Sequence, residues 1–292
     1  MAMTAAILAA LVLAQGDDVI RVNARLVVHH ATVADANGRL LTTLTRQDFA
    51  VSENNVKQAI SYFKREDVPV SMGLVVDTSG SMKGRMDKVA AAAFAFVKAS
   101  HPQDEVFVVN FNDELKLEAP FTNDRAKLGQ ALERLSPQGG TAMRTAILYS
   151  LNYLRTKGKR EKKVLLVITD GDDNMSAAEN TLERVIVESQ RRDVLVYSIG
   201  FFSDEERGKA RNARRALTEI AQATGGVAFF PEQLGEIEPL CLQIAHELRN
   251  QYVLGYSPSE QTLDGSFRKV RVTAKGPGHP TVRTRAGYYA NK

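Results

Sequence analysis

The sequence contains only one cysteine, Cys241, so no disulfide can form within the chain. Stability must therefore come from a hydrophobic core. The chain has 292 residues, of which 44% are apolar and 25% are charged, which is enough for one large domain or two smaller ones. Cys241 lies in a helical pattern, and we expect it to be a small buried hydrophobic side chain.

Long hydrophobic runs are also missing. The apolar stretch at residues 4–14 is uncharged but too short to cross a bilayer as a helix. The letters VLA before Gln15 form a small-residue cleavage site, although no lysine or arginine precedes the stretch. We therefore predict a signal peptide over residues 1–14 and an exported protein, found in the periplasm, in the cell envelope or secreted. The alternative is a frayed N-terminal helix. No cysteine lies near the cleavage point, so we expect no lipid anchor there.

The chain carries little excess charge of either sign. Net charge is +4, and the basic residues are scattered except for KGKREKK at 157–163, a run typical of a solvated loop. No alternation of basic and aromatic residues occurs, so nucleic-acid binding is not expected. A P-loop NTPase is excluded because no G-x-x-x-x-G-K-[ST] is present, and GSMKG at 80–84 has the wrong spacing. The histidines are not at metal-ligand spacing; they are His29, His30, His101, His246 and His279.

Both ends of the sequence have strand-like patterns. Residues 15–68 include DANG (35–38), a hairpin turn, and two short strands around an Asn-Asn turn in 49–63. Residues 251–292 alternate apolar and polar side chains in QYVLGYSP, SFRKVRVTAKG and TVRTRAGYYA. Because chain ends usually lie close together in a domain, we predict that the two segments pair in one small β-domain.

The middle of the chain, residues 69–250, alternates between strands and helices. Near-continuous apolar runs, typical of strands covered on both faces, occur at 70–77, 105–111, 163–170, 194–201 and 227–231, with a short edge strand possible at 115–121. Helical patterns occur at 85–100, 124–135, 141–156, 178–191, 207–223 and 235–250. The fold class is therefore α/β, with a doubly wound, mostly parallel sheet inserted in the small β-domain.

Carboxylates and hydroxyls follow three elements of this predicted sheet. Asp77 ends the first strand, and Ser79 and Ser81 follow it in DTSGS. Thr141 opens a helix after two glycines, and Asp170 ends a later strand in VITDGDDN. Ligands of such sheets bind at the carboxyl ends of the strands, so we expect these five side chains to meet at one point.

Five hard oxygen ligands suit Mg²⁺, or alternatively Mn²⁺ or Ca²⁺, rather than Zn²⁺. Each part alone has an ordinary structural explanation: D-x-S-x-S and Gly-Gly-Thr are common helix caps, and TDGDD can be a turn. Their joint occurrence, each at the top of the same sheet, favours a metal site. Because the hydroxyls are neutral, an ion held there would stay electrophilic and could accept one more carboxylate from outside.

These residues resemble a known family. The combination DTSGS, GGT and TDG on this strand pattern is similar to the von Willebrand factor A domain with its metal-ion-dependent adhesion site. The resemblance covers about residues 70–250. It implies that Ser79, Ser81 and Thr141 supply hydroxyls, that Asp77 and Asp170 supply carboxylates, some through water, and that the sixth position takes a Glu or Asp of a partner protein.

The flanking segments also resemble exported bacterial proteins of this superfamily, of a type common in Acidobacteria. One position departs from the pattern. Many relatives carry Asp where this chain has Thr145, so we expect a somewhat lower affinity for the metal. The resemblance implies a non-enzymatic, metal-dependent protein-binding or adhesion module.

Two other functions fit parts of the pattern. Phosphatases of the haloacid dehalogenase type also place Asp after the first strand, but they need a second carboxylate two residues later, where this chain has Ser79, and no positioned base is evident. A structural envelope subunit with a purely structural metal remains the other alternative.

Overall fold

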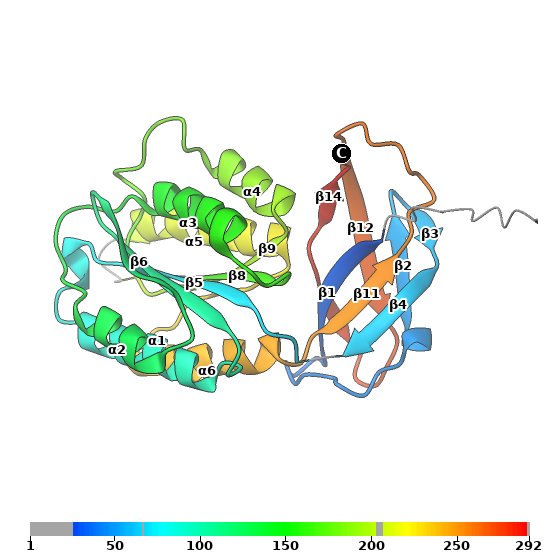
Figure 1. Cartoon of the computed structure of the whole chain (residues 1–292), viewed down its shortest axis with the longest axis horizontal. Helices are drawn as coiled ribbons and strands as arrows, with labels where there is room; N and C mark the ends of the chain where they lie inside the picture. Colours follow the sequence, from blue (N-terminus) through cyan, green and yellow to red (C-terminus); the bar gives the residue numbers. More distant parts are fainter. Residues whose placement is uncertain (1–25, 66, 203–206, 291–292) are drawn as a thin grey trace, which may run out of the picture.

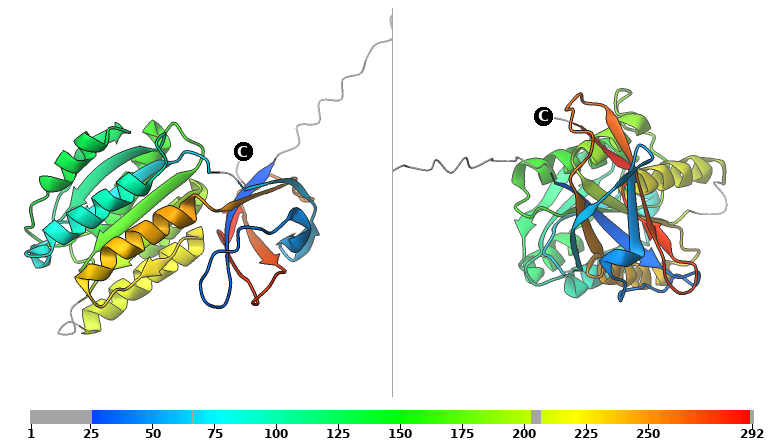
Figure 2. Two further views of the ribbon diagram at one scale, coloured as in Figure 1. Left: turned by 90° about the horizontal axis from the view of Figure 1, so that it is seen from below. Right: turned by 90° about the vertical axis from the view of Figure 1, so that its right-hand side faces the viewer.

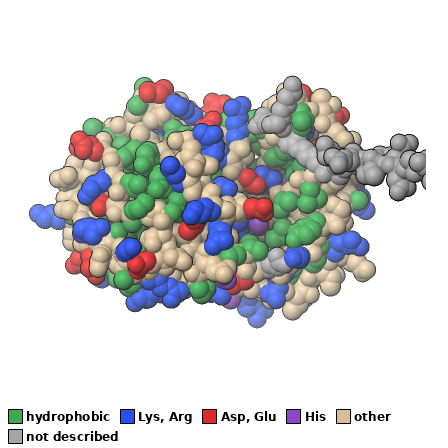
Figure 3. Space-filling view, in the orientation of Figure 1, with side chains coloured by type: hydrophobic (Ala, Val, Ile, Leu, Met, Phe, Trp, Pro, Cys, Tyr) green, Lys and Arg blue, Asp and Glu red, His purple; other side chains and the backbone are tan. Residues whose placement is uncertain are grey.

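The computed structural model describes residues 26–65, 67–202 and 207–290, and the predicted signal peptide lies outside them. The described chain forms two units side by side, an α/β unit and a smaller β unit (Figure 1). Within the part that the structure describes, no helix is both long and apolar enough to cross a membrane. On the face shown in Figure 3, lysine and arginine side chains are spread over both units, as the sequence indicated.

A six-stranded sheet with the order β10-β9-β8-β5-β6-β7 forms the centre of the α/β unit. Neighbouring strands run parallel except for β7, which pairs antiparallel with β6 at the edge. This confirms the predicted fold class. The strands are β5 (Ser71–Asp77), β6 (Glu105–Phe111), β7 (Leu115–Thr122), β8 (Lys163–Thr169), β9 (Val194–Gly200) and β10 (Ala228–Phe229).

Helices cover both faces of this sheet (Figures 1 and 2). One face carries α1 (Met86–Ala99), α2 (Arg125–Glu133) and α6 (Ile237–Leu248), and the other carries α3 (Met143–Lys157), α4 (Leu182–Arg191) and α5 (Arg207–Thr224). Successive strand residues point to opposite faces, so Leu74 packs in the first layer and Val75 in the second. Cys241 of α6 is fully buried, as expected.

The β unit consists of two four-stranded sheets, with orders β13-β1-β11-β4 and β14-β12-β2-β3. Its strands are β1 (Val27–Ala34), β2 (Phe49–Glu53), β3 (Val56–Gln58), β4 (Ile60–Arg65), β11 (Tyr252–Tyr256), β12 (Phe267–Ala274), β13 (Thr281–Arg283) and β14 (Gly287–Tyr289). Strands from the two chain ends alternate: β1 pairs with β11 and β13, and β12 pairs with β2. Apolar side chains of both sheets, with the buried Tyr252 and Tyr256, fill the space between them.

Three details of the β unit differ from the prediction. DANG is a turn, but only a single bridge, between Ala34 and Leu40, follows it instead of a second strand. The Asn-Asn turn joins β2 and β3, with positive φ at Asn54 and Asn55, yet the segment then continues as a third strand, β4, in the other sheet. The last predicted strand divides into β13 and β14, which belong to different sheets.

A buried carboxylate joins the two units. Glu247 of α6 is 2% exposed and accepts hydrogen bonds from Tyr197 of β9 (2.6 Å), Thr32 of β1 (3.0 Å) and Arg283 of β13 (2.5 Å). Two of its three donors, Thr32 and Arg283, come from the β unit, so separating the units would remove these two partners, one of which is its only ionic partner among the three, which is costly. The α/β unit and the β unit therefore depend on each other at this contact.

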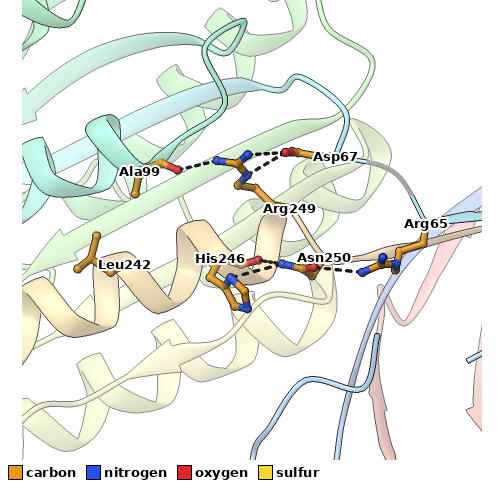
Figure 4. A pocket seen from close by; sticks show the side chains of 7 residues that line it. All are labelled: Arg65, Asp67, Ala99, Leu242, His246, Arg249 and Asn250. Carbon is orange, nitrogen blue, oxygen red and sulfur yellow. Dashed lines mark hydrogen bonds and ion pairs between the residues drawn. The ribbon is translucent and has the colours of Figure 1, made fainter. Parts of the chain in front are cut away.

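The chain enters and leaves the α/β unit at one place, shown in Figure 4. Arg249, after α6, pairs with Asp67, before β5 (2.7 Å), and donates to the carbonyl of Ala99 (3.2 Å). Arg65 donates to the side chain of Asn250 (3.3 Å). These side chains line a hollow of about 510 Å³, but they bond mainly to one another, so we interpret it as a structural junction.

Candidate metal centre

The five residues predicted to form the site all lie at the carboxyl ends of the central strands, away from the β unit. Asp77 is the last residue of β5, and Ser79 and Ser81 lie in and beside the short 3₁₀ turn η2 (Gly80–Met82). Asp170 directly follows β8, and Thr141 lies two residues before α3. The parallel pairing of β5 with β8 brings Val76 beside Ile168, so the two strands end at the same level.

A continuous series of contacts joins four of these residues. The backbone N–H of Ser79 donates to Asp77 Oδ1 (2.8 Å). Ser79 Oγ and Ser81 Oγ lie 3.0 Å apart, and Ser81 Oγ donates to Asp170 Oδ1 (2.7 Å). Asp77 and Ser79 are buried, whereas Ser81 is exposed. Both carboxylates and both serine hydroxyls therefore belong to one cluster that opens to solvent at Ser81.

Backbone contacts place Thr141 next to this cluster. The N–H of Gly80 donates to the carbonyl of Gly139 (2.9 Å), which joins the β5 loop to the Gly-Gly-Thr loop. On its other side, the N–H of Thr141 donates to the side chain of Asn174 (2.9 Å). A Cβ atom on Gly171 would lie only 2.9 Å from Thr141 Oγ1, so glycine after Asp170 is what allows the hydroxyl to approach. The three loops thus meet as the sequence predicted.

The two carboxylates lie in an environment that disfavours their negative charge. Burial raises the pKa of Asp77 to about 6, hydrogen bonds from Thr169 and Ser79 oppose the rise, and the charge of Asp170 adds to it. Burial also raises the pKa of Asp170, against the hydrogen bond from Ser81 and the charge of Arg85. Burial thus raises the pKa of both acids, and a cation held between them would stabilise their charged forms.

Two residues of the site were not predicted. Thr169 Oγ1 donates to Asp77 Oδ2 (2.5 Å), so the hydroxyl of the last residue of β8 supports the acid of β5. Arg85, just before α1, pairs through NH1 with Asp170 Oδ2 (2.5 Å). The signal for Thr169 was its place beside Asp170, but a threonine in a strand is usual. Nothing in the sequence pattern marks Arg85, because an arginine just before a helix is common.

The donor set fits a hard divalent cation. Among the described residues, no group of three or more His, Cys, Asp or Glu side chains lies together in a way that could hold a metal ion. A cation here would therefore depend on two carboxylates, Asp77 and Asp170, and on the hydroxyls of Ser79, Ser81 and Thr141. Neutral and anionic oxygens of this kind suit Mg²⁺ or Mn²⁺, not Zn²⁺.

A second hollow, of about 310 Å³, lies next to this cluster. The start of α3, the loop after β8 and α5 line it, including Met143, Arg144, Asp172 and Asp173. Arg144 pairs with Asp173 (3.2 Å), whose carboxylate also accepts from the hydroxyl of Ser176 (2.8 Å). On this side the rim of the candidate site therefore includes one ion pair, between Arg144 and Asp173.

Comparison with known families gives a match over the first part of the α/β unit. Residues 72–172, which include all five site residues, match the family model of the von Willebrand factor type A domain. The chain contains a von Willebrand factor type A domain. The resemblance drawn from DTSGS, GGT and TDG is thereby confirmed at the level of the family.

Individual proteins similar to this chain are distant. An uncharacterized protein of Synechocystis sp. is 25% identical over 189 residues, 62% of this chain and 44% of that protein. The chain thus matches less than half the length of this curated relative.

Solved structures of von Willebrand factor type A domains share the fold. A von Willebrand factor type A protein from Catenulispora acidiphila has a TM-score of 0.54 at 16% identity, covering 82% of this chain and 73% of that one. The corresponding domain of the type V pili tip protein Mfa5 from Porphyromonas gingivalis has a TM-score of 0.52 at 15% identity, covering 62% and 95%. At these identities the likeness concerns the fold alone.

Proposed function

We propose that this chain is a non-enzymatic protein-binding module that holds one divalent cation, Mg²⁺ or alternatively Mn²⁺ or Ca²⁺, and captures an acidic residue of a partner protein. Asp77 and Asp170 would supply the carboxylates that hold the cation, and Ser79, Ser81 and Thr141 the neutral oxygens. When bound, the ion supplies an electrophilic centre that can accept a carboxylate from outside the chain.

One observation carries this proposal: the contact series from Asp77 through Ser79 and Ser81 to Asp170, with Thr141 alongside. Two carboxylates offset the charge of a divalent ion, and three hydroxyls add none. The site is open to solvent at Ser81, so a partner side chain can reach it. A cation held in a site that is open on one side would attract a carboxylate, so the site favours recognition of Glu or Asp.

Two further points support a binding role over catalysis. The position two residues after Asp77 holds Ser79, whose N–H donates to Asp77, so no second acid stands ready there to protonate a leaving group. The groups around the two carboxylates are hydroxyls, backbone amides and Arg85, none of which is a general base at neutral pH.

We further propose that the protein acts outside the cytoplasm. The uncharged apolar stretch at residues 4–14 has the length of a signal peptide core. One structural relative is a domain of a pilus tip protein, a surface location. A periplasmic, envelope or secreted setting would also present the site to protein partners.

The test is selection of peptides from a display library on the immobilised protein in Mg²⁺, with elution by EDTA. We expect eluted peptides to share an essential Asp or Glu, because the partner carboxylate would meet the cation directly. Replacing that acid by its amide should abolish binding. Thr141→Ala should weaken binding at least about tenfold while changing stability by only about 1 kcal/mol, because it removes a neutral oxygen without opening a large cavity.

Thr156→Ala is the control, since Thr156 is exposed near the C-terminal end of α3, the helix that follows Thr141, and its hydroxyl donates to the backbone carbonyl of Asn152. It should leave peptide affinity nearly unchanged. Peptides that bind equally well in EDTA, or with the amide in place of the acid, would show that recognition does not use a metal-held carboxylate.

A further inference from the structure

Arg85 forms an ion pair with Asp170, one of the two carboxylates of the candidate metal centre. Its guanidinium NH1 lies 2.5 Å from Asp170 Oδ2, while Ser81 Oγ takes the other oxygen, Oδ1. The Asp170 side chain has no exposed surface, and that of Arg85 is 29% exposed. Both oxygens of Asp170 are therefore engaged within the chain, one by a neutral hydroxyl and one by a fixed positive charge.

The surroundings hold Arg85 in this position. Gly84, directly before Arg85, has φ +78, a backbone conformation that favours glycine. The N–H of Arg85 donates to the carbonyl of Met82 (2.9 Å), which fixes its backbone against the η2 turn. The guanidinium carbon also lies 5.7 Å from the centre of the Phe201 ring, so the side chain is held between an aromatic face and the carboxylate.

A cation that uses Asp170 must share it with this guanidinium. Arg85 lowers the negative charge available at the carboxylate and adds a repelling charge a few ångströms from any ion held there. Because Asp170 is shielded from water, this repulsion is screened less than it would be on an open surface.

We propose that Arg85 is an internal competitor for Asp170 that lowers the affinity of the centre for divalent cations and stabilises the buried carboxylate when none is bound. This proposal rests on the proposed function, since it assigns Arg85 a role in regulating the same site. It makes occupancy depend on the ambient concentration of the ion. The site would then fill, and bind its partner, only where divalent cations are abundant.

The test is isothermal titration of the full chain with MgCl₂ and MnCl₂, comparing wild type with Arg85→Gln, alongside thermal melts in EDTA. Arg85→Gln should bind both ions about tenfold more tightly or better. In EDTA the same variant should melt at a lower temperature, because the buried Asp170 loses its ionic partner. Arg85→Lys, which keeps the charge, should stay close to wild type in affinity, and Arg85→Met, which removes the charge, provides a second variant should Arg85→Gln fail to fold.

Arg144→Gln is the matched control. Arg144 is 30% exposed, lies on the same rim and pairs with Asp173 instead of Asp170. It should change ion affinity less than about twofold. Equal or weaker binding by Arg85→Gln would overturn the proposal, and weaker binding would show that Arg85 orients Asp170 for the ion. An equal gain in Arg144→Gln would also overturn it, because the effect would then be one of general charge.

The two proposals fail in different ways. If wild type and Arg85→Gln bind ions with the same measurable affinity, the competitor role of Arg85 is wrong and the metal centre stands. If neither protein binds Mg²⁺ or Mn²⁺ at millimolar concentration, the metal centre itself is wrong, and the role of Arg85 falls with it. Binding by Arg85→Gln alone would support both.

Discussion

Asp77 is a carboxylate at the end of a fully buried strand, and its neighbours make that position tolerable. Thr169 donates a hydrogen bond to one of its oxygens, and the N–H of Ser79 donates to the other. Both oxygens of this carboxylate are therefore hydrogen-bonded, although Asp77 is 0% exposed. Burial nonetheless raises its pKa to about 6, so the two hydrogen bonds compensate only part of the cost of burial.

Thr169→Val tests this support, since valine keeps the shape and removes the donor. We expect the metal-free protein to lose about 1–3 kcal/mol in its free energy of unfolding, the usual cost when a buried charged acceptor loses a partner. Urea unfolding in EDTA measures it. Thr156→Val, on an exposed part of α3, is the control. A loss below about 0.5 kcal/mol, as in an ordinary surface change, would mean that Thr169 does not support Asp77.

At this scale the sequence predicted the cluster but not its supports. Asp77, Ser79, Ser81 and Asp170 could be placed together because each follows a strand whose direction in a parallel sheet is fixed. Thr141 lies between two helices and was placed with them because its Gly-Gly-Thr loop opens the second helix. Thr169 and Arg85 act through side-chain directions that depend on packing. A threonine in a strand and an arginine before a helix are common for other reasons, so no pattern distinguished them.

At the scale of the elements, β1 carries two adjacent histidines, of which His29 is buried and His30 is partly buried. His29 is 1% exposed and lies 6.1 Å, centre to centre, from the stacked ring of Tyr256. Burial lowers its pKa well below 6.5, and the nearby charges of Arg285 and His30 lower it further. Burial likewise lowers the pKa of His30 to about 3. Both rings are therefore neutral in the folded protein near neutral pH.

His29→Phe should make the protein less sensitive to acid. Below pH 6.5 the unfolded chain gains a proton at His29 and the folded chain does not, so stability falls as pH falls. Between pH 6.5 and 5 this one group should cost wild type about 2 kcal/mol that the variant does not lose. Urea unfolding at pH 7.5 and pH 5 measures the difference. Parallel losses in both proteins would show that His29 takes up a proton in the folded state.

The elements predicted best are those buried on both sides. The strands β5, β6, β8 and β9 begin and end within a residue of the predicted ranges, because continuous apolar runs and the loops between them mark their ends. The predictions were weakest at edges: β10 is only two residues long, and α4 starts at Leu182 instead of 178. The length of such an element depends on its contacts with a few neighbouring elements, and the periodicity of the sequence does not predict those contacts.

At the scale of the whole molecule, the β unit and the candidate metal centre lie at opposite ends of the central strands. The β unit lies beside the amino-terminal ends of the strands and is joined to α6 through Glu247, while the candidate centre lies at the carboxyl ends (Figure 1). That the chain ends form one β unit could be predicted because neither has enough strands to form a core alone. How its strands divide into two sheets could not, because the turns fix only neighbouring strands.

The most direct measurement is titration of the purified full chain with Mg²⁺ and Mn²⁺ by calorimetry, for wild type, Asp77→Asn and Asp170→Asn. Each acid offsets part of the charge of the ion, and the hydroxyls alone should not hold it. We expect one ion per wild-type chain and no measurable binding by either variant. Asp87→Asn, on the exposed face of α1, should bind as wild type does. Unchanged ion affinity in Asp77→Asn and Asp170→Asn, or no binding by wild type, would contradict the assignment of the metal centre.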